Sequence, residues 1–163
     1  APPREPAISW APVERMLDTN VRGALATLIP AIKPMVARGR GTISAVTSLA
    51  GMRGLPSSAA YSASKAAIST FLESARLELA SCGVSVVDIR PGFVDTPMTR
   101  KNKFKMPFLM DLDDAAEAAV RGLERGVAVV AFPWQLSRAM TLAEKMPDAL
   151  WRKIALRVLP DRS

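Results

Sequence analysis

Hydrophobic positions recur every three to four residues from about Pro12 to Arg38, and this spacing predicts an amphipathic helix. Two prolines, Pro30 and Pro34, should bend or interrupt its far end. Glycines at 39 and 41 then close the helix. The apolar stripe consists of Val13, Met16, Leu17, Val21, Leu25, Leu28, Ile29 and Ile32.

After this helix, short β-branched stretches alternate with longer helical patterns. Consecutive strands joined by helical crossovers form a parallel sheet with helices on its faces, so the pattern predicts an α/β fold. The expected strands are 42–47, 84–90 and 127–132. The expected helices are 59–81, one from Asp113 or Asp114 to about Arg125, 134–145 and 148–159.

Two stretches between these elements lack a regular pattern. Residues 49–58 form a loop with two glycines and a proline. Residues 93–112 are long and irregular, which suggests a mobile loop over a site. The second stretch contains a cluster of basic residues at 100–105. We interpret this cluster as part of a solvated loop in preference to a clamp for phosphate or substrate.

Composition excludes several kinds of chemistry. The chain has no histidine and one cysteine, Cys82, so we expect no metal site, no intrachain disulfide and no histidine-based catalytic triad. Any proton chemistry must therefore use Tyr, Lys, Asp or Glu. The net charge of +7 is scattered and carries no nucleic-acid-binding signature. The longest apolar run, 127–134, is far below the ~20 residues that span a bilayer, and we expect a cytoplasmic protein.

The candidate for that chemistry is a tyrosine–lysine pair. Tyr61 is the only tyrosine and lies four residues before Lys65, so a helix places the two side chains on one face. An ammonium group within a few ångströms favours the phenolate form of a phenol. The pair is therefore a plausible general acid/base, although this spacing also arises by chance.

The predicted topology gathers other polar groups near this pair. In parallel sheets, ligands lie beyond the carboxyl ends of the strands. Ser48, Tyr61 and the turn 91–96 all lie at or just after those ends. We therefore expect these groups to converge on one rim of the sheet.

Four motifs occur along the chain: Asn20, Thr47-Ser48-Leu49-Ala50-Gly51, Tyr61-Ser62-Ala63-Ser64-Lys65 and Ile89-Arg90-Pro91-Gly92-Phe93-Val94-Asp95-Thr96. Their order and spacing, including the thirteen residues from Ser48 to Tyr61, resemble the later motifs of short-chain dehydrogenases/reductases. The resemblance spans roughly residues 10 to 132 and implies a partial Rossmann-like sheet. It divides the chain into 1–132, the C-terminal part of such a domain, and 133–163, a helical tail packing on the same domain.

The resemblance implies roles for these residues in an NAD(P)-dependent interconversion of an alcohol and a ketone or aldehyde. Tyr61 would exchange the proton, Lys65 would hold the nicotinamide ribose and favour the phenolate, and Ser48 would bind the substrate oxygen. Asn20, at a distortion in its helix, would hold a water that relays protons from Lys65. Tyr61, Lys65, Pro91, Gly92, Val94 and Thr96 would contact the cofactor.

Each role has a structural alternative. Ser48 could be a turn residue at a strand end, Asn20 a polar surface residue, and Thr96 a cap of a short helix. Apolar residues of the tail, including Trp134, Leu142 and Trp151, fit a core or an interface better than a peripheral membrane contact.

The sequence departs from the family pattern at its start. Nothing in residues 1–40 resembles the glycine-rich turn that binds the cofactor pyrophosphate, or the Asn-Asn-Ala-Gly-like segment. We therefore expect this chain to be inactive alone. Without the family's first strands, the strand 42–47 would have an exposed edge flanked by apolar helices, so we also expect a homo-oligomer through helices 12–38 and 59–81. The alternative is a non-catalytic fragment that acts as an oligomerisation module. The sequence does not distinguish NAD from NADP or one direction of the reaction from the other. The expected substrate is small and possibly apolar, but its identity is not encoded in these motifs.

Overall fold

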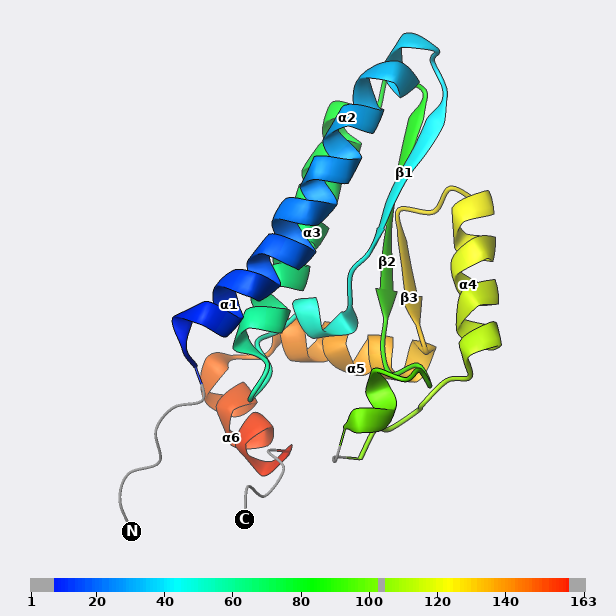
Figure 1. Ribbon diagram of the computed structural model, residues 1–163. Coiled ribbons are helices and arrows are strands. Elements are labelled where there is room, and N and C mark those ends of the chain that lie inside the picture. Colours follow the sequence, from blue (N-terminus) through cyan, green and yellow to red (C-terminus); the bar gives the residue numbers. More distant parts are fainter. Residues whose placement is uncertain (1–7, 103–104, 159–163) are drawn as a thin grey trace.

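The computed structural model describes residues 8–102 and 105–158. Within these ranges, three strands form one sheet of order β1–β2–β3: β1 (Gly41–Val46), β2 (Val84–Pro91) and β3 (Val129–Phe132). Both strand pairs are parallel, with Ile43 opposite Val86 and Arg90 opposite Ala131. The predicted parallel α/β sheet is confirmed, and β1 lies at one of its edges (Figure 1).

Helices cover both faces of this sheet. On one face lie α2 (Ala24–Ala37) and α3 (Ala59–Glu78), and on the other lies α4 (Leu112–Glu124) (Figure 1). Alternation along β2 divides the core, because successive side chains point to opposite faces. Val84 and Val86 pack with Ile68 and Leu72, whereas Val87 and Ile89 pack with Ala115 and Phe132.

The first predicted helix differs from a single uniform element. It begins with α1 (Trp10–Leu17), passes through a π-helical segment at Asp18–Gly23, and continues as α2. The two prolines do not interrupt it, since α2 runs through Pro30 and Pro34 to Ala37. Both prolines are exposed, so water can satisfy the carbonyl groups that lose an amide partner.

Several predicted ends of helices and strands differ from those in the structure. The cap of α4 lies two or three residues earlier than predicted, at Asp111 and not at Asp113 or Asp114. The Asp111 carboxylate accepts a hydrogen bond from the Asp113 amide at 2.8 Å. α3 ends at Glu78, three residues before the predicted position. β3 begins at Val129 and not at residue 127.

The long stretch after β2 is more ordered than its composition suggests. It contains a 3-10 turn at Thr99–Lys101 and a parallel bridge between Val94 and Met110. The amide of Asp95 donates to Met110 O at 2.9 Å, and the Met110 amide donates to Phe93 O at 3.0 Å. These bonds join the two ends of the loop. Residues 103–104 of the basic cluster lie outside the described residues, as do 1–7 and 159–163.

The tail forms α5 (Trp134–Lys145) and α6 (Asp148–Val158), close to the predicted limits. In α5, Met140 is buried while Trp134 and Leu142 are exposed. Across the described residues, every helix is too short or too polar to span a bilayer.

Candidate active site

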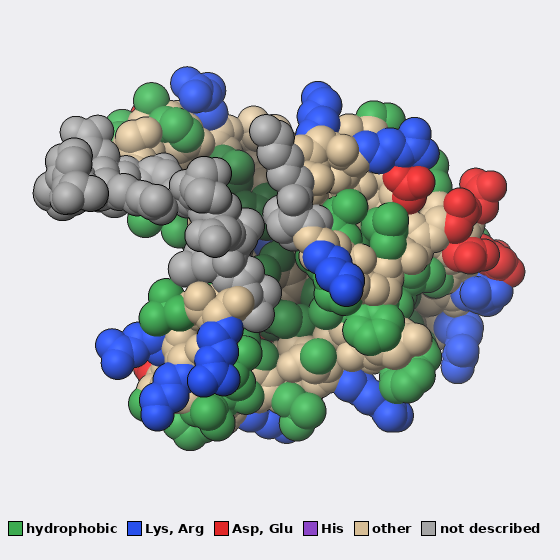
Figure 2. Space-filling model, turned by 90° about the horizontal axis from the view of Figure 1, so that it is seen from below, with side chains coloured by type: hydrophobic (Ala, Val, Ile, Leu, Met, Phe, Trp, Pro, Cys, Tyr) green, Lys and Arg blue, Asp and Glu red, His purple; other side chains and the backbone are tan. Residues whose placement is uncertain are grey.

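The carboxyl ends of β1 and β2 point toward the lower side of Figure 1, and the sequence motifs gather there. Ser48 follows β1, Pro91 ends β2, and Tyr61 and Lys65 lie in the first turns of α3. Figure 2 views the molecule from this side and shows a hollow near its centre, with hydrophobic side chains at its base.

Tyr61 and Lys65 lie together on one face of α3. The Lys65 ammonium is 5.7 Å from the centre of the Tyr61 ring and donates a hydrogen bond of 2.9 Å to Val46 O, at the end of β1. Burial lowers the pKa of Lys65 below its ordinary value of 10.5. The unfolded chain therefore binds this proton more tightly, so the contribution of Lys65 to stability rises with pH between the lowered pKa and 10.5.

Ser48 is buried, and its hydroxyl group both accepts and donates a hydrogen bond. Its Oγ accepts a hydrogen bond from the Ala50 amide at 3.1 Å and donates to Pro91 O at 3.3 Å. The first contact caps the 3-10 turn Leu49–Gly51, as expected if Ser48 is a turn residue. The second contact places Ser48 beside the end of β2. Ser48 can therefore cap the turn and still lie at the carboxyl edge of the sheet.

Gly51 fixes how closely this turn approaches α3. A Cβ atom at Gly51 would lie 2.9 Å from both Ala66 N and Lys65 C, closer than a side-chain atom tolerates. The turn that Ser48 caps therefore contacts the backbone of α3 at Lys65. Only glycine allows this approach, which sets the spacing between the serine and the tyrosine–lysine pair.

Asn20 lies in the π-helical segment, where the resemblance implied a distorted helix. Its Nδ2 donates to Ser64 Oγ at 3.0 Å, and Ser64 Oγ donates to Tyr61 O at 2.8 Å. Asn20 is thus joined to α3 at the residue before Lys65. The water relay implied for Asn20 stays a prediction.

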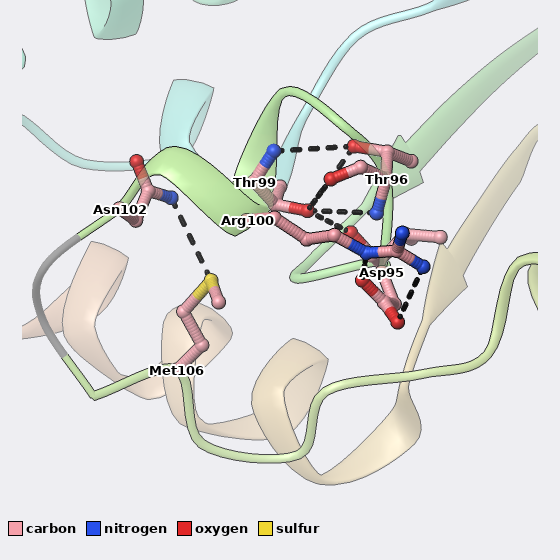
Figure 3. Close-up of polar contacts among 7 residues, drawn as sticks. Asp95, Thr96, Thr99, Arg100, Asn102 and Met106 are labelled. Atoms are coloured by element: carbon pink, nitrogen blue, oxygen red, sulfur yellow. Dashed lines mark hydrogen bonds and ion pairs between the residues drawn. The ribbon is translucent and has the colours of Figure 1, made fainter.

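The residues expected around a nicotinamide ring follow β2. Gly92 is closely packed: an added Cβ would lie 2.7 Å from Leu136 Cδ2. Thr96 Oγ1 lies 3.1 Å from Thr99 Oγ1 and accepts from the Thr99 amide at 3.3 Å, so it stabilises the short turn that follows (Figure 3). The hydroxyl of Thr99 also donates to Val94 O at 2.5 Å.

An ion pair closes the same turn. Arg100 Nε and Nη2 donate to the two carboxylate oxygens of Asp95 at 2.7 and 3.1 Å (Figure 3). The hydrogen bond from Arg100 holds the pKa of the Asp95 carboxyl below its ordinary value. Arg100 is a member of the basic cluster 100–105, and its ion pair with Asp95 joins two parts of the segment 93–112.

Sequence reasoning missed a buried polar group beneath the rim. Asp88 is 1% exposed; its carboxylate accepts from Thr47 Oγ1 at 2.5 Å and from Arg90 Nε at 2.6 Å. Thr47 also donates to Ile89 O at 3.1 Å and immediately precedes Ser48. A charged residue inside a predicted strand, two positions before an arginine, was the available signal.

The parallel sheet and the polar groups at its carboxyl edge define a Rossmann-like α/β protein. The chain belongs to the short-chain dehydrogenase family, whose model matches residues 5–106. It is 48% identical over 151 residues to an uncharacterized oxidoreductase of Myxococcus xanthus and 36% identical over 112 residues to one of Staphylococcus saprophyticus. These matches cover 93% and 69% of this chain.

A solved structure gives the same assignment. A short-chain dehydrogenase from Burkholderia cenocepacia in complex with NADP is 29% identical, with a TM-score of 0.73, and the match covers 91% of this chain and 61% of that one. The chain spans 60% of the Myxococcus relative and 48% of the Staphylococcus relative.

Proposed function

We propose that this chain supplies the acid/base half of an NAD(P)-dependent oxidoreductase that interconverts an alcohol and a ketone or aldehyde. The observation that carries the proposal is the placement of the Lys65 ammonium between the Tyr61 ring and the end of β1. The turn after β1 carries Ser48 and contacts α3 at Lys65. A proton donor, a cation and a hydroxyl therefore lie along one edge of the sheet.

The described residues fit the nicotinamide and ribose end of such a cofactor. An ammonium group has three hydrogen-bond donors, and Val46 O accepts one from Lys65, which leaves donors for ribose hydroxyls. The NADP in the Burkholderia relative supports a nicotinamide nucleotide. When bound, the nucleotide supplies or accepts the hydride.

The protein's own groups handle the proton and the charge. In the reducing direction, the Tyr61 hydroxyl gives its proton to the substrate oxygen and becomes a phenolate, which the Lys65 ammonium stabilises. Ser48 Oγ donates to the same oxygen as negative charge develops there. In the oxidising direction, the Tyr61 phenolate takes the proton from the alcohol.

Nucleotide binding tests the proposal directly. The full-length gene product should quench or shift NADPH or NADH fluorescence in a saturable titration. Residues 1–163 alone should bind with a Kd above about 1 mM, because they lack a glycine-rich turn for the pyrophosphate. If the full-length product shows no saturable binding, the proposed function is wrong.

We further propose that the chain forms a homo-oligomer through α2 and α3. An open groove of about 650 Å³ lies on this side. Seven of its nine lining residues are apolar, among them Leu25, Ile29 and Ala67, and the other two are Asp18 and Arg22. Ile29 is 52% exposed there. Apolar patches of this kind are typical of protein interfaces.

Charge in this groove should therefore abolish association. Ile29→Glu is expected to shift the chain from oligomer to monomer in sedimentation velocity at micromolar concentration, with circular dichroism unchanged. Leu142→Glu, at a 69% exposed position on α5, is the matched control and should stay oligomeric. A wild-type chain that is monomeric at this concentration contradicts the proposal.

A further inference from the structure

The segment 52–58 joins the turn that follows Ser48 to the helix that carries Tyr61, so its two ends lead to two candidate catalytic groups. It contains no regular helix or strand. Two adjoining residues in it, Arg53 and Gly54, contact the tail 91 to 97 positions later in the sequence. We call the group formed by Arg53, Gly54, Asp148 and Trp151 the Arg53 clamp.

The guanidinium group of Arg53 makes three contacts with the tail. It forms an ion pair with the Asp148 carboxylate, at the start of α6. Its Nη1 donates to Glu144 O at 3.4 Å, near the end of α5. It also lies 5.9 Å from the centre of the Trp151 ring. One planar side chain thus joins α5, the start of α6 and an aromatic ring, which a lysine ammonium cannot do as well.

Trp151 completes the clamp from the other side. Its Nε1 donates to Gly54 O at 3.2 Å, so the same indole contacts the side chain of Arg53 and the backbone of the next residue. The Arg53 side chain is 20% exposed, whereas the Asp148 side chain is 97% exposed. The arginine is therefore largely shielded from water, whereas an ion pair to a solvent-facing carboxylate contributes little by itself.

The position of α6 gives the clamp a consequence for the site. Figure 1 shows α6 on the lower side of the molecule, toward which the carboxyl ends of the strands point. α6 is fixed there to the segment that runs from the turn after Ser48 to Tyr61. Its Leu150 and Ile154 are 48% and 37% exposed, so α6 carries apolar surface.

We propose that the Arg53 clamp holds α6 against segment 52–58 as one wall of the substrate opening, and that Arg53 is a positioning residue for substrate binding. The proposal rests on the proposed function for its substrate, a carbonyl compound or alcohol with apolar substituents. The clamp acts on the wall beside Tyr61 and not on the transferred proton. Loosening it should therefore weaken substrate binding while the chemical step continues.

Amide hydrogen exchange on residues 1–163 tests the clamp without any enzyme activity. Arg53→Gln should speed exchange in 52–58 and at the start of α6 by only about tenfold, because the ion pair and the cation–π interaction of Arg53 are each weak, while β2 stays protected. Arg138→Gln is the matched control: Arg138 lies 5.1 Å from the Trp134 ring on α5 but has no contact with segment 52–58 among the described residues. Unchanged exchange in Arg53→Gln overturns the clamp.

Kinetics of the full-length gene product test the effect on substrate. Arg53→Gln and Trp151→Leu should each raise KM for a bulky ketone about tenfold, with kcat within about threefold. This result is expected when a variant weakens binding of the ground state and of the transition state by the same amount. Arg138→Gln should match the wild type. Unchanged KM in an active Arg53→Gln enzyme overturns the positioning role but leaves the proposed function standing. If Arg53→Gln exchanges faster but the wild-type full-length product has no oxidoreductase activity, the clamp is supported and the proposed function is refuted.

Discussion

The Tyr61→Phe variant of the full-length gene product is expected to lose carbonyl-reducing turnover by about 10²- to 10⁴-fold, the contribution typical of a positioned general acid. The change removes the one phenolic hydroxyl in the sequence and keeps the aromatic ring beside Lys65. Binding of NADPH or NADH should stay within about twofold of the wild type, because the ammonium that would hold the ribose is untouched. Steady-state kinetics and a fluorescence titration measure the two quantities.

A second hydroxyl deletion in the same helix serves as its control. Ser74→Ala removes an exposed hydroxyl group from α3 and should leave both kcat and nucleotide binding unchanged. Turnover retained in Tyr61→Phe would contradict the acid/base assignment. Loss of nucleotide binding in the same variant would instead indicate that the phenol supports the cofactor site.

The Asp88→Ala substitution is expected to destabilise the chain by about 3–5 kcal/mol, the cost of breaking a buried ion pair. It would leave the guanidinium of Arg90, 19% exposed, without its carboxylate and would remove one of the two acceptors of the Thr47 hydroxyl. Whole domains are stable by only about 5–15 kcal/mol, so this variant should be near its unfolding threshold. Urea unfolding followed by circular dichroism measures the loss.

An exposed ion pair provides the comparison. Glu117→Ala breaks the pair with Arg121 on α4, whose side chains are 63% and 59% exposed, and should cost less than about 1 kcal/mol. Replacing both Asp88 and Arg90 by apolar residues should recover part of the stability lost in Asp88→Ala, since no charge is left uncompensated. A loss in Asp88→Ala no larger than that in Glu117→Ala would show that the buried cluster does not stabilise the sheet.

Local signals were sufficient for most of the secondary structure and for the central pair. The four-residue spacing of Tyr61 and Lys65 fixes their common face on any helix, and the structure places the ammonium near the ring. Alternation of β-branched and helical segments predicted the parallel sheet, and with it the common edge at which Ser48 and Pro91 meet. These inferences succeeded because each depends on periodicity or on the order of elements along the chain.

Other features depended on choices between nearly equivalent local signals. Asp111, Asp113 and Asp114 can each cap a helix, and only the position of the chain before α4 selects Asp111. Pro30 and Pro34 resemble helix breakers, but α2 continues through both at the surface. The family resemblance implied a distortion of the helix at Asn20, which the structure shows to be a π-helical segment; propensity alone does not mark it.

By itself, the sequence determined the α/β class, the family motifs and the spacing of the tyrosine–lysine pair, since all of these depend on periodicity, spacing or order along the chain. Only the tertiary structure decided which distant groups meet: Asp88 with Thr47, Asn20 with Ser64, and Arg53 with Trp151. Such contacts join residues roughly 40 to 100 positions apart, and they form only when the packing of sheet and helices brings the segments together. Candidate catalytic groups could be proposed from the chain, whereas the contacts that hold them in place required the fold.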